Sequence, residues 1–340
     1  MIQVLVADDS FLTRMVVRDI IGSTADIAVV GEAENGREAV ALTMELKPDL
    51  IIMDLMMPVM DGLEAIEEIM AHCPTPILVL SATVDEREVT QAFSAIKKGA
   101  LDVMEKPVAG IDPNGGFASR LVEKVRLLSR IRVIHRPRRR VREEVPPPAR
   151  CHGGVRSILA IGASTGGPKA VMSILKSLPA DFKGAVFVVQ HISRGFTRGF
   201  AQWLDNESSL AIRLAVDGDE VVAGTVLVAP DDCHMILSQG RVRLVTGEPV
   251  NCCRPSVDVF FTSMAAEYGA RAVGVLLTGM GRDGAEGMLR IKEHGGVTIV
   301  QDEPSCAVFG MPKAAIALSA VDEVVPLNGI PDAITRIFQY

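Results

Sequence analysis

The stretch that decides the fold reads S-I-L-A-I-G-A-S-T-G-G-P-K, residues 157–169. Its first half, 158–161, is a short uncharged apolar run, which is typical of a strand buried on both faces of a parallel sheet. Glycines then crowd around Ser164, and Pro168 begins an amphipathic run that continues to Leu178. Because proline is tolerated in the first turn of a helix, the stretch predicts a strand, a tight glycine-rich turn and a helix.

Two kinds of chemistry use a glycine-rich turn at a helix N-terminus. Its backbone N–H groups can hold a phosphate, or they can stabilise an oxyanion while a serine hydroxyl attacks a carbonyl. The Walker spacing is absent, because Ala170 follows Lys169, and the dinucleotide pattern G-x-G-x-x-G is absent too. The turn alone leaves open a third interpretation, in which Ser164 only caps the helix.

Length and composition limit the classes of protein to consider. A chain of 340 residues, 48% of them hydrophobic, favours two domains. A formal net charge of −7 provides no basic field for nucleic acid. The N-terminus lacks the basic region of a signal peptide, and no apolar run approaches the roughly 18 residues that span a membrane. The six cysteines form no C-x-x-C pair, so we expect reduced thiols in a cytoplasmic protein without membrane insertion.

The first 131 residues alternate between strand and helix patterns. Strand patterns occupy 3–7, 27–32, 50–53, 77–80 and 101–104. Helix patterns lie near 11–22, 36–46, 61–70, 85–98 and 118–131. Five βα units predict an open parallel sheet with helices on both faces, a flavodoxin-like (βα)5 domain.

Polar side chains follow four of these strands. Asp8 and Asp9 come after the first strand, Asp54 after the third, Ser81 after the fourth and Lys106 after the fifth. Function in such sheets lies at the carboxyl ends of the strands. Three carboxylates there repel one another unless a hard cation binds them, so we expect Asp8, Asp9 and Asp54 to bind Mg²⁺. Lys106 and Ser81 suit contacts with a phosphoryl oxygen.

This domain resembles a response-regulator receiver over essentially all of residues 1–125. The motifs that carry the resemblance are D-D at 8–9, D-L-M-M-P-V-M-D-G at 54–62, S-A at 81–82 and K-P at 106–107. The resemblance implies that Asp54 is the phospho-acceptor, that Mg²⁺ is the cofactor of phosphorylation, and that Ser81 and Lys106 contact the phosphoryl group. Val103 stands where many receivers carry an aromatic switch residue, so the resemblance does not extend to that switch.

The composition changes between residues 132 and 153. This segment holds an arginine cluster, the triplet P-P-P and a glycine pair. Such a segment cannot bury a core, and it predicts an extended spacer between a first domain at 1–131 and a second at 154–340. Binding of nucleic acid by the arginines is the less favoured alternative, because no aromatic residues interleave with them.

The second domain repeats the alternation. Further strand patterns occupy 184–190, 272–277, 297–301 and 323–326. Helix patterns lie near 197–204, 256–268, 285–294 and from 331 onward. Four short β segments at 211–216, 224–229, 234–238 and 241–245 suggest antiparallel hairpins. We therefore expect a second doubly wound, mainly parallel α/β domain with an antiparallel hairpin portion.

Three chemically complementary side chains in this domain each follow a buried strand. They are Ser164, His191 and Asp283. Because the carboxyl ends of parallel strands share one edge of a sheet, the three can meet there. A base must take the proton of a serine nucleophile, and His191 suits that task, with the Asp283 carboxylate on its other ring nitrogen. The backbone N–H of Met280 is a candidate oxyanion donor. Asp302, which follows the strand pattern at 297–301, is a reserve candidate for contact with the substrate or with a loop.

The second domain resembles the catalytic domain of CheB-type chemotaxis methylesterases. The matching motifs are I-G-A-S-T-G-G-P at 161–168, V-V-Q-H at 188–191 and L-L-T-G-M-G-R-D-G-A-E-G at 276–287. The resemblance implies hydrolysis of glutamate methyl esters, and deamidation of glutamines, on methyl-accepting chemoreceptors by Ser164, His191 and Asp283, with Thr165 and Met280 as active-site contacts. No cofactor is implied for this reaction.

The family also implies regulation and partners. An unphosphorylated receiver would inhibit the catalytic domain until a chemotaxis-type histidine kinase supplies the phosphoryl group to Asp54. Two other functions stay open on the residues alone. One is a response regulator whose second domain only binds a partner or nucleic acid, against which no helix-turn-helix pattern follows the linker. The other is a phosphate-binding transferase, which the missing Walker pattern disfavours.

Overall fold

The computed structural model describes residues 1–82, 86–106, 116–131, 133 and 157–338. The chain divides into two compact units, Met1–Val141 and Arg142–Tyr340. Most of the spacer expected at 132–153 lies outside the described residues, so the domain limits at 131 and 154 stay a prediction. Among the described helices, none is both long and apolar enough to cross a membrane.

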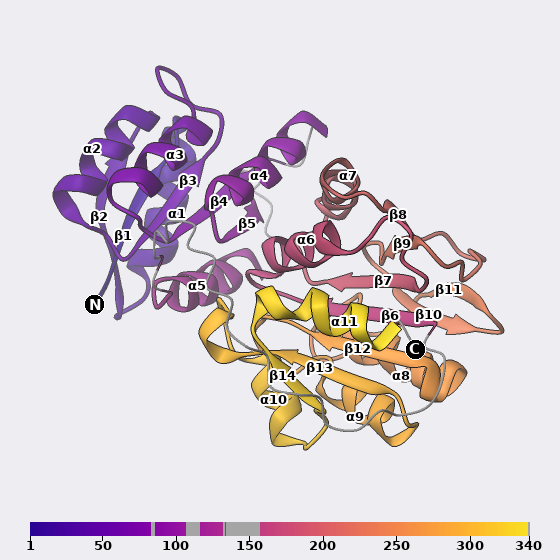
Figure 1. Cartoon of the computed structure of the whole chain (residues 1–340). Coiled ribbons are helices and arrows are strands. Elements are labelled where there is room, and N and C mark those ends of the chain that lie inside the picture. The colour runs from indigo at the N-terminus through magenta and orange to yellow at the C-terminus, as the bar shows by residue number, and fades with distance from the viewer. Residues whose placement is uncertain (83–85, 107–115, 132, 134–156, 339–340) are drawn as a thin grey trace. The chain divides into compact units, whose positions relative to one another are not determined.

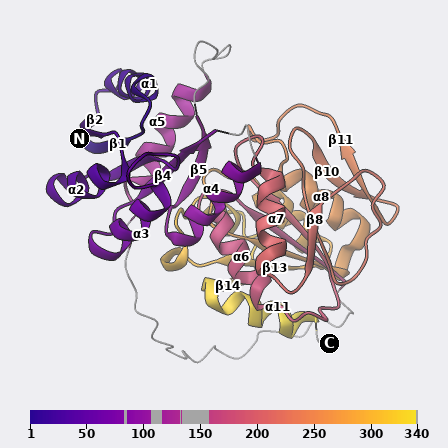
Figure 2. The same ribbon diagram turned by 90° about the horizontal axis from the view of Figure 1, so that it is seen from above.

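The first unit is a parallel five-stranded sheet in the order β2-β1-β3-β4-β5. Its strands are β1 (Ile2–Ala7), β2 (Ile27–Ala33), β3 (Leu50–Asp54), β4 (Ile77–Ser81) and β5 (Asp102–Glu105). Its helices are α1 (Phe11–Gly22), α2 (Gly36–Leu46), α3 (Gly62–His72), α4 (Glu86–Lys98) and α5 (Gly116–Leu128). Helices α1 and α5 pack together on one face of the sheet, and α2, α3 and α4 cover the other (Figures 1 and 2). The predicted (βα)5 fold is confirmed.

The second unit is built on a seven-stranded sheet in which all neighbours are parallel, in the order β14-β13-β12-β6-β7-β9-β8. Its strands are β6 (Ile158–Ala163), β7 (Ala185–Gln190), β8 (Ala211–Leu214), β9 (Thr225–Val228), β12 (Ala272–Leu276), β13 (Val297–Gln301) and β14 (Glu323–Val325). A separate antiparallel pair consists of β10 (His234–Ser238) and β11 (Arg241–Val245).

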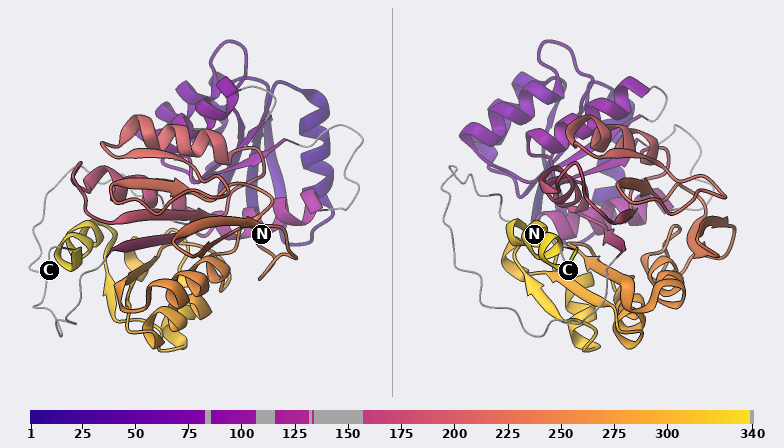
Figure 3. Two further views of the ribbon diagram at one scale, coloured as in Figure 1. Left: turned by 90° about the vertical axis from the view of Figure 1, so that its right-hand side faces the viewer. Right: turned by 45° about the vertical axis from the view of Figure 1, so that its right-hand side comes forward.

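Helices cover both faces of the larger sheet (Figure 3). They are α6 (Gly167–Ser177), α7 (Thr197–Glu207), α8 (Val257–Tyr268), α9 (Ala285–Glu293), α10 (Met311–Ala317) and α11 (Ile330–Phe338). Helix α6 contacts α7 and α11, whereas α9 contacts α8 and α10. Three short 3-10 helices complete the described part at Gly269–Arg271, Glu303–Ser305 and Leu327–Gly329. The predicted doubly wound, mainly parallel fold with a hairpin portion is confirmed.

The expected hairpin arrangement is wrong for two of the four short segments. β10 and β11 do pair antiparallel, but β8 pairs parallel with β9, and β9 pairs parallel with β7. Alternating burial along a strand is the same for a parallel and an antiparallel neighbour, so the sequence pattern does not reveal strand direction. The connection from β8 to β9 is long enough to return alongside β11, where Gly218 N and Asp219 O bond the backbone of Val242.

Helix α8 lies unusually close to β6, and a glycine makes that approach possible. A Cβ atom on Gly162 would lie 2.4 Å from Cγ1 of Val257, the first residue of α8. Real Cβ atoms do not come that near, so this position in β6 requires glycine. The start of α8 is thereby held against the strand that leads into Ser164.

We predict that Gly162→Ala destabilises the second unit by about 1–3 kcal/mol, because the added methyl group overpacks a buried contact. Gly247→Ala is the matched control, since its Cβ would meet only His234 at an ordinary 3.6 Å. The single tryptophan, Trp203, is buried in this unit, so urea unfolding followed by its fluorescence reports on it. Equal unfolding midpoints for the two variants would refute the packing argument.

Candidate functional site

The carboxyl edge of the larger sheet gathers the residues singled out in the second domain. Strand β6 lies between β12 and β7. Ser164 directly follows β6, and its N–H donates to Thr278 O at 3.1 Å. His191 directly follows β7, and its N–H donates to Ala163 O at 2.9 Å. The turn after β12 leads to Asp283, just before α9.

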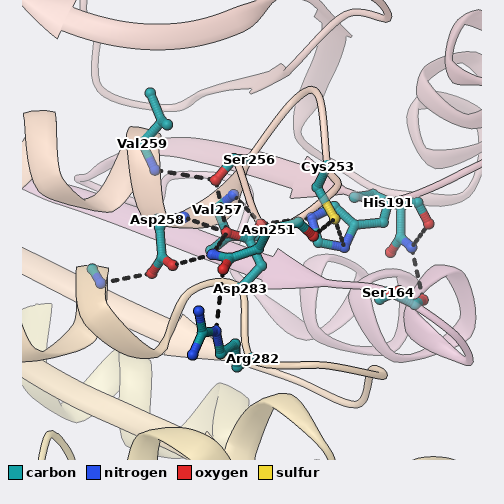
Figure 4. Close-up of polar contacts among 12 residues, drawn as sticks. Ser164, His191, Asn251, Cys253, Ser256, Val257, Asp258, Val259, Arg282 and Asp283 are labelled. Atoms are coloured by element: carbon teal, nitrogen blue, oxygen red, sulfur yellow. Dashed lines mark hydrogen bonds and ion pairs between the residues drawn. The ribbon is translucent and has the colours of Figure 1, made fainter. Parts of the chain in front are cut away.

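His191 and Asp283 are in direct contact. Nε2 of His191 lies 2.8 Å from Oδ2 of Asp283, as Figure 4 shows. The carboxylate is buried, whereas the imidazole side chain keeps 14% of its surface exposed. A carboxylate at one ring nitrogen holds the proton there and leaves the other nitrogen, Nδ1, as the basic site.

The N-terminus of α8 holds the Asp283 carboxylate in place. Oδ1 accepts from Ser256 Oγ at 2.7 Å, and Oδ2 accepts from Val257 N at 2.7 Å. Asp258 N and Asn251 Nδ2 each donate to Oδ1 at 3.2 Å. Burial raises the pKa of Asp283, but the bonds from His191, Ser256 and Val257 outweigh it and lower the pKa to about 2. The carboxylate is therefore ionised at neutral pH.

The sequence reasoning missed the residues that support Asp283. Ser256 was an identifiable N-cap, since it precedes an apolar helical run, and its hydroxyl does accept from Val259 N. Nothing in the local pattern indicated that the same hydroxyl also donates to Asp283. Asp258, whose pKa is raised to about 6 mainly by burial, was missed as well, and its carboxylate accepts from Gly287 N.

The second ring nitrogen of His191 faces a cysteine. Nδ1 lies 3.6 Å from Cys253 Sγ, and in the described part of the chain this thiol, not the Ser164 hydroxyl, is its hydrogen-bond partner. Burial lowers the pKa of His191, but the contacts with Asp283 and Cys253 overcome it and raise the pKa to about 9. Cys253 was predicted only as a reduced thiol, and no sequence signal pointed to this contact.

Ser164 lies where the glycine-rich turn after β6 meets the glycine-rich turn after β12. A Cβ atom on Gly279 would lie 2.7 Å from Ser164 Cβ, so the second turn packs directly against the serine. The buried Gln190 side chain donates from Nε2 to the carbonyls of Ser164 and His191, at 2.8 Å each. One amide thus fixes the two strand ends relative to each other.

The other residues predicted for this site are Thr165, Met280 and Asp302, and their surroundings differ. Thr165 is buried, and its carbonyl accepts from Thr278 Oγ1 at 3.0 Å. Met280 is 41% exposed in the turn after Gly279, so its side chain is not part of the core. Asp302 instead caps the short helix Glu303–Ser305, where it accepts from Ser305 N, so it is not drawn into the contacts of Asp283.

The receiver-like unit gathers its acidic residues around Lys106. Lys106 Nζ lies 3.0 Å from Asp8 Oδ2 and 2.7 Å from Asp54 Oδ2. Both carboxylates are buried, while Asp9 is exposed. Ser81 is buried at the end of the neighbouring strand β4, and its hydroxyl donates to Ala82 O.

Excess negative charge remains at this edge. Burial raises the pKa of Asp54 to about 6, the contact with Lys106 opposes the rise, and the nearby Asp8 carboxylate adds to it. Oxygen atoms of Asp8, Asp9 and Asp54 lie within 4.8 Å of one another. Three carboxylates, two of which contact a single lysine, fit a hard divalent cation with oxygen ligands. Val103, at the position of the missing aromatic switch, is fully buried in β5.

Comparisons with known proteins match both halves. The CheB methylesterase family model matches residues 159–334, and the response regulator receiver domain model matches residues 4–112. A protein-glutamate methylesterase/protein-glutamine glutaminase of Anaeromyxobacter dehalogenans is 46% identical over 99% of this chain and 97% of its own length. A protein of the same name from Pseudomonas fluorescens is 45% identical over 91% of each chain.

A solved structure agrees with these matches. The CheB methylesterase catalytic domain of Thermotoga maritima superposes with a TM-score of 0.52 at 38% identity, over 55% of this chain and 99% of that one. Both resemblances that the motifs indicated are therefore confirmed. The chain belongs to the CheB methylesterase family and carries a response regulator receiver domain ahead of its methylesterase domain.

Proposed function

We propose that this chain is a phosphorylation-regulated serine hydrolase that demethylates glutamate methyl esters on cytoplasmic segments of chemoreceptors, releases methanol and also deamidates glutamines. Its family membership and the names of its relatives support the reaction class. The observation that carries the proposal in this chain is the 2.8 Å contact between His191 and the buried Asp283, at the strand edge that presents Ser164.

In the proposed mechanism, Ser164 Oγ attacks the ester carbonyl and its proton passes to Nδ1 of His191. In the neutral form of the imidazole, Nδ1 is the base because Nε2 is committed to Asp283. The imidazolium then protonates the departing methoxide, which leaves as methanol. Water, deprotonated by the same nitrogen, releases the glutamate from the acyl-enzyme. These side chains carry the reaction without a cofactor.

Asp283 positions His191 and stabilises the positive charge that forms on it. Backbone N–H groups of Thr165 and Met280, in the two adjoining turns, would bind the oxyanion. Catalytic hydrogen bonds often form only in the substrate complex. We expect the Ser164 hydroxyl to replace Cys253 Sγ as the partner of Nδ1 there.

The receiver domain supplies the regulation in this proposal. Asp54 accepts a phosphoryl group from a chemotaxis-type histidine kinase, and Ser81 and Lys106 contact it. Mg²⁺ held by Asp8, Asp9 and Asp54 would neutralise the acidic cluster and so favour the approach of a phosphoryl donor. The unphosphorylated receiver inhibits hydrolysis, and the added charge relieves that inhibition. The domain limits we propose are 1–131 and 154–340, joined by a basic, proline-rich linker.

Removal of the nucleophile tests the hydrolase assignment. We predict that Ser164→Ala lowers the rate of methanol release from methylated receptor membranes by several orders of magnitude, about 10⁶-fold if it behaves like a triad serine. Ser177→Ala, on the exposed face of α6, is the control and should keep the full rate. Methanol release by the Ser164 variant at the control rate would rule out Ser164 as the nucleophile.

The role of Asp283 has its own test. We predict that Asp283→Asn lowers kcat about 10⁴-fold with little change in KM, because the imidazole loses the partner that fixes its tautomer. Asp302→Asn is the matched control at the same sheet edge, where an amide oxygen can still accept from Ser305 N. Trp203 fluorescence checks that both variants are folded. A folded Asp283→Asn variant with normal kcat would contradict the assignment.

Regulation is tested on the full chain. We predict that acetyl phosphate with Mg²⁺ raises the rate of methanol release by the unmodified chain and has no such effect on Asp54→Asn. Asp61→Asn is the control, because asparagine can retain the N-cap bond that Asp61 accepts from Glu64 N at 2.8 Å. An Asp54 variant activated as strongly as the control would disprove phosphorylation of Asp54 as the switch.

A further inference from the structure

The contact between His191 and Cys253 places two potential metal ligands side by side. We propose that Nδ1 of His191 and Sγ of Cys253 together bind Zn²⁺, and that bound Zn²⁺ reversibly blocks hydrolysis. Imidazole nitrogen and thiolate sulfur are the ligands that Zn²⁺ prefers. A ring nitrogen of His191, Sγ of Cys253 and a carboxylate oxygen of Asp283 lie within 4.8 Å of one another.

The distance between the two proposed ligand atoms matches zinc coordination. Zn–N bonds of about 2.0–2.1 Å and a Zn–S bond of about 2.3 Å, at a tetrahedral angle, place nitrogen and sulfur about 3.6 Å apart. Nδ1 and Sγ lie 3.6 Å apart in this structure. The metal can therefore be accepted at these two atoms without a change in their separation.

Asp283 supports the proposed site by binding the other ring nitrogen of His191, Nε2. Its oxygens already accept bonds from Ser256, Val257 and His191, so it is not free to become a direct ligand. A carboxylate bound to the far nitrogen of a metal-binding histidine fixes the ring and makes the ligating nitrogen more basic. The 2.8 Å contact at Nε2 is this kind of support.

The site is accessible and can release the protons that metal binding displaces. His191 is 14% exposed and Cys253 is partly exposed, so water can fill the remaining coordination positions. Cys253 Sγ also lies 3.4 Å from Asn251 O, so the single thiol proton is shared between this carbonyl and Nδ1 of His191, as Figure 4 illustrates. On binding, the thiol proton and any proton on Nδ1 pass to solvent, and Zn²⁺ takes both lone pairs.

Inhibition follows from the identity of the ligand atom. Nδ1 is the nitrogen that takes the proton of Ser164 in the proposed mechanism, so a metal there removes the base. This consequence rests on the proposed hydrolase function, whereas binding itself does not. Binding and inhibition can therefore be measured separately.

The first experiment detects binding with Co²⁺ as a spectroscopic substitute for Zn²⁺, on the full chain in excess Mg²⁺, which occupies the acidic cluster of the receiver. We expect a thiolate-to-cobalt charge-transfer band in the near ultraviolet, which Zn²⁺ abolishes by displacement. The band should be lost in Cys253→Ala and kept in Cys252→Ala, the control that removes the adjacent exposed thiol.

The second experiment measures methanol release at increasing concentrations of free Zn²⁺. We expect inhibition that a chelator reverses, and a half-inhibiting concentration raised at least about tenfold in Cys253→Ala but not in Cys252→Ala. Each variant is compared with its own rate in the absence of zinc, so any change in basal rate cancels.

The outcomes separate the two proposals. Absence of the cobalt band from the unmodified chain, or its persistence in Cys253→Ala, would overturn the metal site and leave only a thiol–imidazole hydrogen bond. If the cobalt band depends on Cys253 but the rate of methanol release does not respond to Zn²⁺, the proposed inhibition is wrong although the metal site is correct. A chain that binds Co²⁺ through Cys253 yet releases no methanol without zinc, even when acetyl phosphate and Mg²⁺ are present, would keep the metal site and refute the hydrolase function.

Discussion

The carboxyl edge of the larger sheet, where Ser164 and His191 lie, is organised around the buried carboxylate of Asp283. Removing Asp283 from water is costly, and it is tolerated because donors from α8, from the 251–256 loop and from His191 surround it. Those donors come from two segments far apart in the chain, the end of β7 at His191 and residues 251–258. The same bonds that stabilise the charge therefore also fix the helix, the loop and the imidazole relative to one another, and breaking them would disturb all three.

Close backbone packing makes this network possible. Gly162 lets Val257 approach β6, and Gly284 has a φ of 93° and a hypothetical Cβ only 2.5 Å from Leu276. Gly284 directly follows Asp283 and begins α9 as its N-cap. A side chain at either glycine would push α8 or α9 outward. The glycine-rich motifs thus have two effects. They form the turn that presents Ser164, and they allow the close packing of α8 and α9 around the Asp283 carboxylate.

The sequence predicted those features that local patterns encode. Buried strands ending at Ser164, His191 and before Asp283 were visible as apolar runs followed by polar residues, and the sheet geometry then brought their ends to one edge. Cys253 escaped detection because it reaches His191 through a loop whose course is set by tertiary contacts, with Cys252 at a φ of 63°. The parallel direction of β8 was not predicted for a similar reason. The alternation of residues along a strand does not show which strand it pairs with or in which direction.

The two acidic centres show how environment decides what an aspartate can do. Asp283 accepts enough hydrogen bonds to lower its pKa to about 2. Because these bonds also engage its lone pairs, the carboxylate is suited to orienting the His191 imidazole and not to acting as a nucleophile. Asp54 receives a bond from Met56 N on Oδ1 and lies against Lys106 through Oδ2, and its pKa rises to about 6. Among the described residues, Oδ2 of Asp54 contacts Lys106 and lies beside other carboxylates, which is consistent with the phospho-acceptor role proposed for Asp54. Asp54 ends β3 and Asp283 lies in the turn that follows β12, so both stand at the carboxyl edge of a sheet and their different environments arise from the donors around them.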